Sequence, residues 1–185
     1  SAAPSENPLL NPLTCKGDIE LKEIEFVYGE KDALKISALT INKGEKIAVI
    51  GEIGSGKSTL AHTLSANVCS ADEYFMVDGE YVFDKSKLEE AHEYCVSKCV
   101  KMMRDDNDTV VIDNTNVTLN EYKKYIDLGT IHGYHVIILE IYCHNRNQAV
   151  NFSTRTTHKV SSNDVLKMLA KWETNDDAFL LLPYS

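Results

Sequence analysis

Apolar and polar residues alternate in two stretches near the start of the chain, at residues 19–26 and 34–41. A period of two is typical of a strand with one face on the core and the other in solvent, and such strands pair antiparallel. The sequence therefore predicts two half-exposed antiparallel strands. A turn at 42–45 follows, and the apolar run at 46–50 predicts the first fully buried strand.

After residue 50, short apolar runs alternate with segments of helical period. The predicted elements are strands at 68–70, 109–113 and 134–141, and helices at 87–104, at 119–131 and around Gln148 and Val165. On the first of these helices, Leu88, Ala91, Cys95, Cys99 and Met102 share one face. A small hairpin is expected between 74–77 and 81–83, because Asp78-Gly79 is a typical two-residue turn. Buried strands alternating with helices indicate an α/β fold with a parallel sheet.

The first buried strand runs directly into a phosphate-binding P-loop, Gly51-Glu52-Ile53-Gly54-Ser55-Gly56-Lys57-Ser58-Thr59. Its glycines let backbone N–H groups approach an anion, Lys57 can reach the β- and γ-phosphates, and Ser58 can ligate Mg²⁺. The following helix directs its positive N-terminal end at the phosphates. We therefore predict an α/β P-loop NTPase three-layer fold with a parallel central sheet, preceded by an antiparallel β segment, and the expected cofactors are ATP and Mg²⁺.

Two acidic residues follow other predicted strands. Asp113 ends the strand at 109–113, where the second acidic element of NTPases acts on the metal or its water shell; a turn cap through Asn114 and Thr115 is the alternative. Asp72 lies beyond the second strand, where a carboxylate can orient an acceptor hydroxyl and take its proton; a helix or turn cap is again the alternative. Ligands bind at the carboxyl ends of parallel strands, so both acids and the P-loop are expected at one edge of the sheet.

Composition limits the class of protein. With 185 residues and 43% hydrophobic content the chain can bury a full core, and no apolar run approaches the roughly 20 residues that span a bilayer. The N-terminus has no basic region followed by an apolar stretch, and the five cysteines show no paired framework, which favours a reducing cytoplasm. His92, Cys95 and Cys99 would share a helical face, where packing explains them better than a metal site without a fourth ligand.

The net charge of −9 argues against a broadly basic surface that coats nucleic acid, so any such contact must be local. Positive residues collect late in the chain, as a funnel for phosphates or as a solvated face: Arg146, Arg155, His158 and Lys159. Arg155 lies in a polar segment between two predicted helices, as a lid arginine would. There it could stabilise charge on a transferring phosphoryl group.

From Lys46 to about Glu173 the chain resembles the polynucleotide-kinase-like P-loop kinases, in particular the kinase modules of NEDD4-binding-protein-type proteins. The matching segments are residues 54–61, 70–75, 79–92 and 111–116. The resemblance implies that Lys57 and Ser58 bind ATP and Mg²⁺, that Asp72 is the general base, and that Arg155 closes over the donor phosphates. It also implies transfer of the ATP γ-phosphate to a 5′-hydroxyl of RNA or DNA.

Two features depart from that family. Phe75 stands where phage-type members place an arginine that holds the acceptor's phosphate, and the late arginine pattern is present only as Arg155-Thr156-Thr157-His158-Lys159. Residues 17–28 and 39–51 instead resemble the opening strands of an ABC-transporter ATPase domain, in which an aromatic residue at the position of Tyr28 stacks on adenine. The Leu-Ser-Gly-Gly-Gln signature of those domains is absent downstream. The chain is therefore interpreted as composite, with its seam in or near the P-loop, whether by natural recombination or by construction.

These observations predict a flexible arm or linker at 1–17 and one P-loop kinase-like domain at 18–185, with an ABC-like β segment at 18–45 and a kinase-like core at 46–173. The leading hypothesis is a metal-dependent kinase whose partners are ATP and the 5′ ends of RNA or DNA, without membrane insertion. A small-molecule P-loop kinase is the nearest alternative, since the chain is acidic and carries Phe75. An ATP-binding module with little turnover is the other. The apolar residues 178–182 are expected to pack on the core or to meet a partner.

Overall fold

The computed structural model describes residues 19–28, 31–41, 45–51, 57–141, 147, 150 and 160–181. The predicted arm at 1–17, the middle of the P-loop at 52–56, the helix expected around Gln148 and the late basic residues Arg146, Arg155, His158 and Lys159 lie outside these residues.

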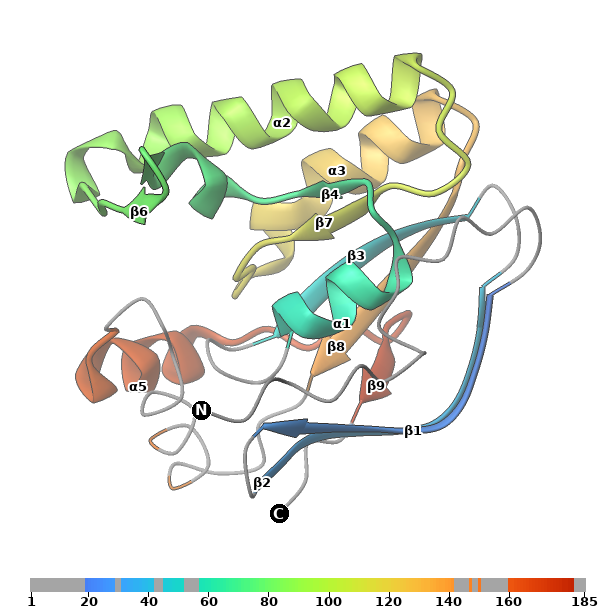
Figure 1. The fold of residues 1–185 in the computed structure, drawn as a ribbon, viewed down its shortest axis with the longest axis horizontal. Coiled ribbons are helices and arrows are strands. Elements are labelled where there is room, and N and C mark those ends of the chain that lie inside the picture. The colour runs from blue at the N-terminus through green and yellow to red at the C-terminus, as the bar shows by residue number, and fades with distance from the viewer. Residues whose placement is uncertain are drawn as a thin grey trace.

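A five-stranded parallel sheet forms the centre of the described fold (Figure 1). Its order is β4-β7-β3-β8-β9, and the strands are β3 (Glu45–Gly51), β4 (Val68–Cys69), β7 (Val111–Asp113), β8 (His135–Ile141) and β9 (Phe179–Leu181). All four neighbouring pairs are parallel, which confirms the predicted sheet. β9 adds most of the apolar segment 178–182 to one edge of this sheet, beside β8.

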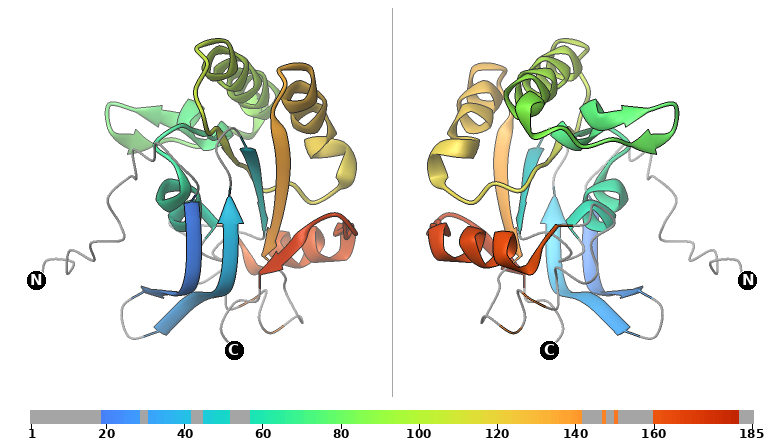
Figure 2. Two further views of the ribbon diagram at one scale, coloured as in Figure 1. Left: turned by 90° about the vertical axis from the view of Figure 1, so that its right-hand side faces the viewer. Right: turned by 90° about the vertical axis from the view of Figure 1, so that its left-hand side faces the viewer.

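Helices cover both faces of the sheet (Figure 2). α1 (Lys57–Leu64) lies on one side and buries Leu60, Ala61 and Leu64. α2 (Leu88–Arg104) and α3 (Leu119–Ile131) contribute to one shared core with β4 and β7 on the other side. α5 (Ser162–Lys171) follows late in the chain and packs around the buried Val165. The arrangement is the predicted three-layer α/β fold.

The buried stripe of α2 consists of Ala91, Cys95, Cys99 and Met103, each four residues after the last. The sequence predicted Met102 in the last place, but Met102 is only partly buried, and it packs at the edge of the same core. Cys69 of β4 faces this stripe, with its Sγ 3.4 Å from Met102 Sδ. A hydrogen bond with Cys99, together with burial, raises the pKa of the Cys69 thiol, so it remains protonated in the core.

The two predicted N-terminal strands are present as an antiparallel pair, β1 (Ile19–Tyr28) and β2 (Lys31–Ile41), which forms a sheet of its own. The pairing register shifts between Phe26 and Val27. Nowhere in the described part of the chain does a helix have the length and apolar character needed to cross a bilayer.

A short helix replaces part of the predicted hairpin strand. Tyr74 and Phe75 end a 3-10 helix, η1 (Ala71–Phe75), so the hairpin strands shrink to β5 (Met76–Val77) and β6 (Glu80–Tyr81). The predicted turn is correct: Asp78 and Gly79 have φ of 50° and 84°, which glycine adopts without strain. A second 3-10 helix, η2 (Lys85–Lys87), leads from the hairpin into α2.

Candidate active site

Three neighbouring strands bring the predicted site together. β4, β7 and β3 are adjacent and parallel, so their carboxyl ends lie at the same edge of the sheet. Asp113, the last residue of β7, is in register with Val49, two residues before the P-loop glycine Gly51. η1, with Asp72, begins two residues after β4. This edge is the expected location of a ligand in a parallel sheet.

The phosphate-binding segment is described at its two ends. Gly51 ends β3, and Lys57 is the first residue of α1, whose first turn carries no acidic residue. That leaves the positive N-terminal end of α1 without a competing carboxylate on its own first turn, which suits an anion. Ser58 is solvent-exposed. Glu52, Ile53, Gly54, Ser55 and Gly56 lie outside the described residues, and Lys57, Thr59 and Tyr28 are described by their backbone alone.

Asp72 is solvent-exposed and lies in the first turn of η1. The cap of this helix is Ser70, whose Oγ accepts a hydrogen bond from the backbone N of Asp72 at 3.3 Å. The Asp72 carboxylate instead accepts a hydrogen bond from the Tyr81 hydroxyl, at 3.1 Å to Oδ1. Burial and the nearby charge of Asp72 raise the pKa of Tyr81, so the phenol keeps its proton and remains a donor.

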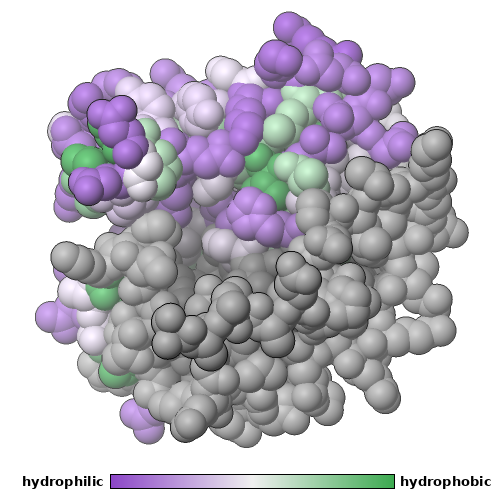
Figure 3. All heavy atoms as spheres, viewed as in Figure 1, coloured by the Kyte–Doolittle hydropathy of each residue, from purple (hydrophilic) through white to green (hydrophobic). Residues whose placement is uncertain are grey.

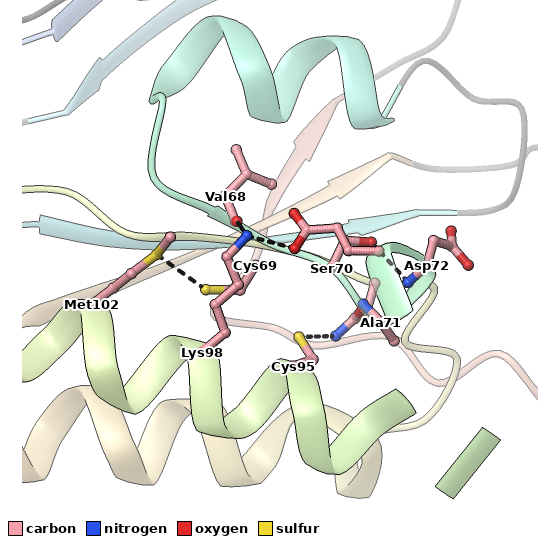
Figure 4. A network of polar contacts seen from close by, with 10 residues as sticks. Val68, Cys69, Ser70, Ala71, Asp72, Cys95, Lys98 and Met102 are labelled. Carbon is pink, nitrogen blue, oxygen red and sulfur yellow. Dashed lines mark hydrogen bonds and ion pairs between the residues drawn. The ribbon is translucent and has the colours of Figure 1, made fainter. Parts of the chain in front are cut away.

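A buried amide connects the two acidic strand ends. Asn114 follows Asp113 and is 4% exposed. Its Oδ1 accepts from the backbone N of Ala71 at 2.8 Å, and its Nδ2 donates to Cys95 Sγ at 3.3 Å and to the Tyr125 hydroxyl at 3.2 Å. Figure 4 labels Ala71 of η1 and Cys95 of α2, two of the residues that this amide joins. The start of η1 is thus fixed to β7, α2 and α3 by one side chain.

A second contact holds η1 from the side of α2. The Lys98 ammonium donates to the carbonyl of Val68 at 2.8 Å and to the carboxylate of Glu73 (Figure 4). Since Val68 belongs to β4 and Glu73 to η1, Lys98 ties the strand to the turn that follows it. The exposed Asp72 therefore rests on a framework of buried and half-buried hydrogen bonds.

Asp113 and Asn116 provide buried polar groups at the end of β7. Asp113 is 4% exposed, and carboxylate oxygens are preferred ligands of Mg²⁺. Asn116 is equally inaccessible, and its Nδ2 has no hydrogen-bond partner among the described residues. A buried polar atom without a partner is rare, and binding sites are among the places where it occurs.

The predicted position of Asp72, Asp113 and the end of the P-loop strand at one edge of the sheet is confirmed. No sequence pattern indicated Tyr81, Lys98 or the hydrogen bonds of Asn114. Asn114 is part of the 111–116 motif, but its partners at positions 71, 95 and 125 are not marked by any local pattern.

The family model described as an AAA domain matches residues 47–175, about seven tenths of the chain. The chain belongs to this family. The match begins within β3 and ends after α5, so it contains the P-loop, Asp72 and Asp113. Together with the parallel sheet and the P-loop motif that follows β3, this match supports nucleotide binding by the AAA domain.

Two curated relatives each align with more than half of the chain. Human NEDD4-binding protein 2 is 34% identical over 125 residues, which is 65% of this chain and 7% of that protein. A phosphonates import ATP-binding protein from Fusobacterium nucleatum is 34% identical over 116 residues, 60% of this chain and 45% of that protein. The chain therefore spans less than half the length of either relative. The resemblance to a NEDD4-binding-protein-type module has a counterpart in the first of these relatives. The resemblance to an ABC ATPase has one in a putative ABC transporter ATP-binding protein from Streptococcus pneumoniae, 36% identical over 83 residues, which is 45% of this chain and 13% of that protein.

Among solved structures, a gluconokinase from Sinorhizobium meliloti shares the fold. Its TM-score is 0.52 at 13% identity, and the match covers 77% of this chain and 84% of the gluconokinase chain. At this identity the likeness concerns the fold alone.

Proposed function

We propose that this AAA domain transfers the γ-phosphate of ATP, with Mg²⁺, to a 5′-hydroxyl of a polynucleotide. The observation that carries the proposal is the position of Asp72: an exposed carboxylate, held by a hydrogen-bonded framework, at the sheet edge where the P-loop strand ends. A carboxylate there is suited to orient an acceptor hydroxyl.

The donor side uses β3, the P-loop and α1. Backbone N–H groups at the start of α1 would hold phosphate oxygens, and Lys57 would contact the β- and γ-phosphates. The residues fit Mg²⁺, since an exposed serine hydroxyl at Ser58 and a buried carboxylate at Asp113 are both hard oxygen ligands at one edge. Mg²⁺ bound there would neutralise charge on the phosphates. Stacking of Tyr28 on adenine and closure by Arg155 belong to the same proposal and rest on the family resemblances.

The chemistry requires one proton to be removed from the acceptor. The acceptor oxygen forms a bond to the γ-phosphorus while the bond from that phosphorus to the β-γ bridging oxygen breaks, so ADP leaves. The hydroxyl proton passes to the Asp72 carboxylate. Tyr81 holds Oδ1 of that carboxylate through its hydrogen bond and so fixes its orientation.

The polynucleotide as acceptor is supported by the resemblance of residues 70–75 and 111–116 to polynucleotide-kinase-like proteins and by the similarity to NEDD4-binding protein 2. A small-molecule acceptor is the alternative, and the net charge of −9 favours it. Transfer of radiolabelled phosphate from ATP to 5′-hydroxyl oligonucleotides, compared with small alcohols and sugars, separates these acceptors. We expect labelled oligonucleotides, and none with Lys57→Ala; label on small alcohols alone would refute a polynucleotide acceptor.

Asp72→Asn tests the assigned base. The amide keeps the shape of the carboxylate and an oxygen for the Tyr81 hydroxyl, but it cannot take the acceptor's proton. We expect single-turnover transfer to fall by roughly 10²-fold or more, while ATP affinity and the melting temperature stay near those of the parent. Asp127→Asn, at an exposed carboxylate paired with Lys123 on α3, is the control and should transfer normally. Retained transfer in Asp72→Asn would remove Asp72 from the mechanism.

A further inference from the structure

Exposed apolar side chains are concentrated on the β5–β6 hairpin. Of the seven large apolar residues that are exposed in the described part of the chain, four lie between positions 76 and 83: Met76, Val77, Val82 and Phe83. Each is exposed by 50–54%. In Figure 3, apolar surface shows at the corner of the molecule where Figure 1 places β6. Single exposed apolar residues need no explanation, but a group of this kind marks an interaction site.

Aromatic rings give this surface a defined geometry. Tyr81 and Phe83 are two residues apart, and their rings are stacked, with ring planes within 11° of parallel at a centroid distance of 6.5 Å. Phe75 packs against both rings edge to face, with its ring centroid 6.0 Å from that of Tyr81 and 5.1 Å from that of Phe83. Since Phe75 is 3% exposed and part of the core, the two outer rings rest on a rigid support.

The same surface is continuous with the candidate active site. The ring of Tyr81 belongs to the aromatic surface, and its hydroxyl donates to Asp72 Oδ1. A molecule that lies on the rings of Tyr81 and Phe83 therefore has the proposed base at one end. Charge near the tip is negative, from the exposed Asp78 and Glu80, which disfavours phosphate groups on the hairpin itself.

We propose that Tyr81 and Phe83 form the site for the base of the acceptor's 5′-terminal nucleoside. This assignment rests on the proposed function and names its acceptor subsite. Bases stack on aromatic side chains irrespective of sequence, because every base has a flat π-face, and such stacking needs no phosphate contact. A base is the part of the acceptor that suits flat rings on an acidic hairpin, and the 5′-hydroxyl attached to its sugar would lie toward Asp72.

The test is a cycle of two proteins and two acceptors. Parent and Phe83→Ala each phosphorylate an oligonucleotide with a normal 5′-terminal residue and the same oligonucleotide with an abasic 5′-terminal residue. We expect Phe83→Ala to raise the acceptor KM by about 5- to 150-fold for the normal acceptor and to leave the abasic acceptor unchanged. The KM for ATP should not change, which also shows that the variant is folded.

Two further variants sharpen the result. Val82 is exposed as much as Phe83 but has no aromatic ring on which a base can stack, so Val82→Ala should leave the acceptor KM unchanged. Phe83→Trp retains a flat ring and should restore binding. The assignment is overturned if Phe83→Ala raises the KM of both acceptors equally. It is also overturned if the parent phosphorylates oligonucleotides and Phe83→Ala has the same acceptor KM as the parent, since the hairpin would then bind another partner. A parent that transfers to no oligonucleotide refutes the proposed function, and the base site with it.

Discussion

Buried residues that hydrogen-bond to several elements fix the position of the exposed groups in the candidate site. The amide of Asn114 satisfies a backbone N–H in η1 with its oxygen, and a thiol in α2 and a hydroxyl in α3 with its nitrogen. Because these partners are buried, loss of the amide would leave them without the hydrogen bonds that it makes. Asn114 is therefore expected to position Asp72 without touching the acceptor.

Asn114→Ala is expected to lower kcat for phosphoryl transfer about 10-fold while leaving the KM for ATP unchanged, since small displacements of a catalytic group are costly. It should also lower the free energy of unfolding by about 1–3 kcal/mol, because the Ala71 N–H is left buried and unpaired. The control is Asn107→Ala, which removes a side-chain hydrogen bond of Nδ2 to the Met102 carbonyl at the far end of α2. Asn107→Ala should lose stability but keep kcat, so equal kcat values for the two variants at low temperature would contradict a positioning role.

At the scale of elements, the local pattern of apolar residues was sufficient to predict the helices whose amphipathic segments are long. α3 begins and ends at the predicted residues, and α2 begins one residue later than predicted. The strand predicted at 109–113 shortens to Val111–Asp113, and Tyr74 and Phe75 turn from strand into 3-10 helix. The change at Tyr74 and Phe75 has a cause outside the local pattern. The turn at η1 is fixed by Ser70 and by Asn114, and a hydrogen bond over 43 positions leaves no trace in the local periodicity.

The N-terminus of α3 shows how local chemistry fixes a boundary. The Glu121 carboxylate accepts from the backbone N of Val117 at 2.7 Å and lies 3.4 Å from the N of Thr118, an arrangement typical of a capping box. Glu121→Ala should lower the free energy of unfolding by about 1 kcal/mol, measured by urea denaturation. Lys123→Ala, which removes only an exposed ion pair with Asp127, should cost less than about 0.5 kcal/mol. An equal decrease in the free energy of unfolding in both variants would show that the capping hydrogen bonds of Glu121 do not stabilise the helix.

At the scale of the whole molecule, the parallel sheet gathers residues that the sequence separates. Asp72 and Asp113 are 41 positions apart, yet Asp72 lies just after β4 and Asp113 ends β7, and these two strands pair directly. The same topology buries Glu140 of β8 in the interior, 2% exposed, where its Oε1 accepts from Trp172 Nε1 at 2.7 Å. Burial raises the pKa of Glu140, while the hydrogen bonds from Trp172 and the backbone of Asn175 partly offset it.

This raised pKa predicts a pH dependence of stability. Between the ordinary pKa of a glutamate, about 4.3, and the raised value, the folded state binds more protons than the unfolded state. The contribution of Glu140 to stability is therefore present at low pH and is lost as the pH rises through its folded pKa. Glu140→Gln keeps the acceptor for Trp172 and removes the titration. Urea denaturation at pH 5 and pH 8 should show a smaller loss of stability on raising the pH in Glu140→Gln than in the parent; an equal loss in both would contradict the assignment.

The hairpin between β5 and β6 has a consequence for how such proteins diverge. Its two anchoring rings, Phe75 and Tyr81, are packed on the core, whereas every residue from Met76 to Glu80 is exposed. Substitutions at the tip, or insertions that lengthen it, should therefore change the free energy of folding little, since the entropy cost of closing a loop rises only slowly with its length. The tip can therefore vary among relatives and change the acceptor that is bound, while the phosphate-binding part of the molecule stays constant.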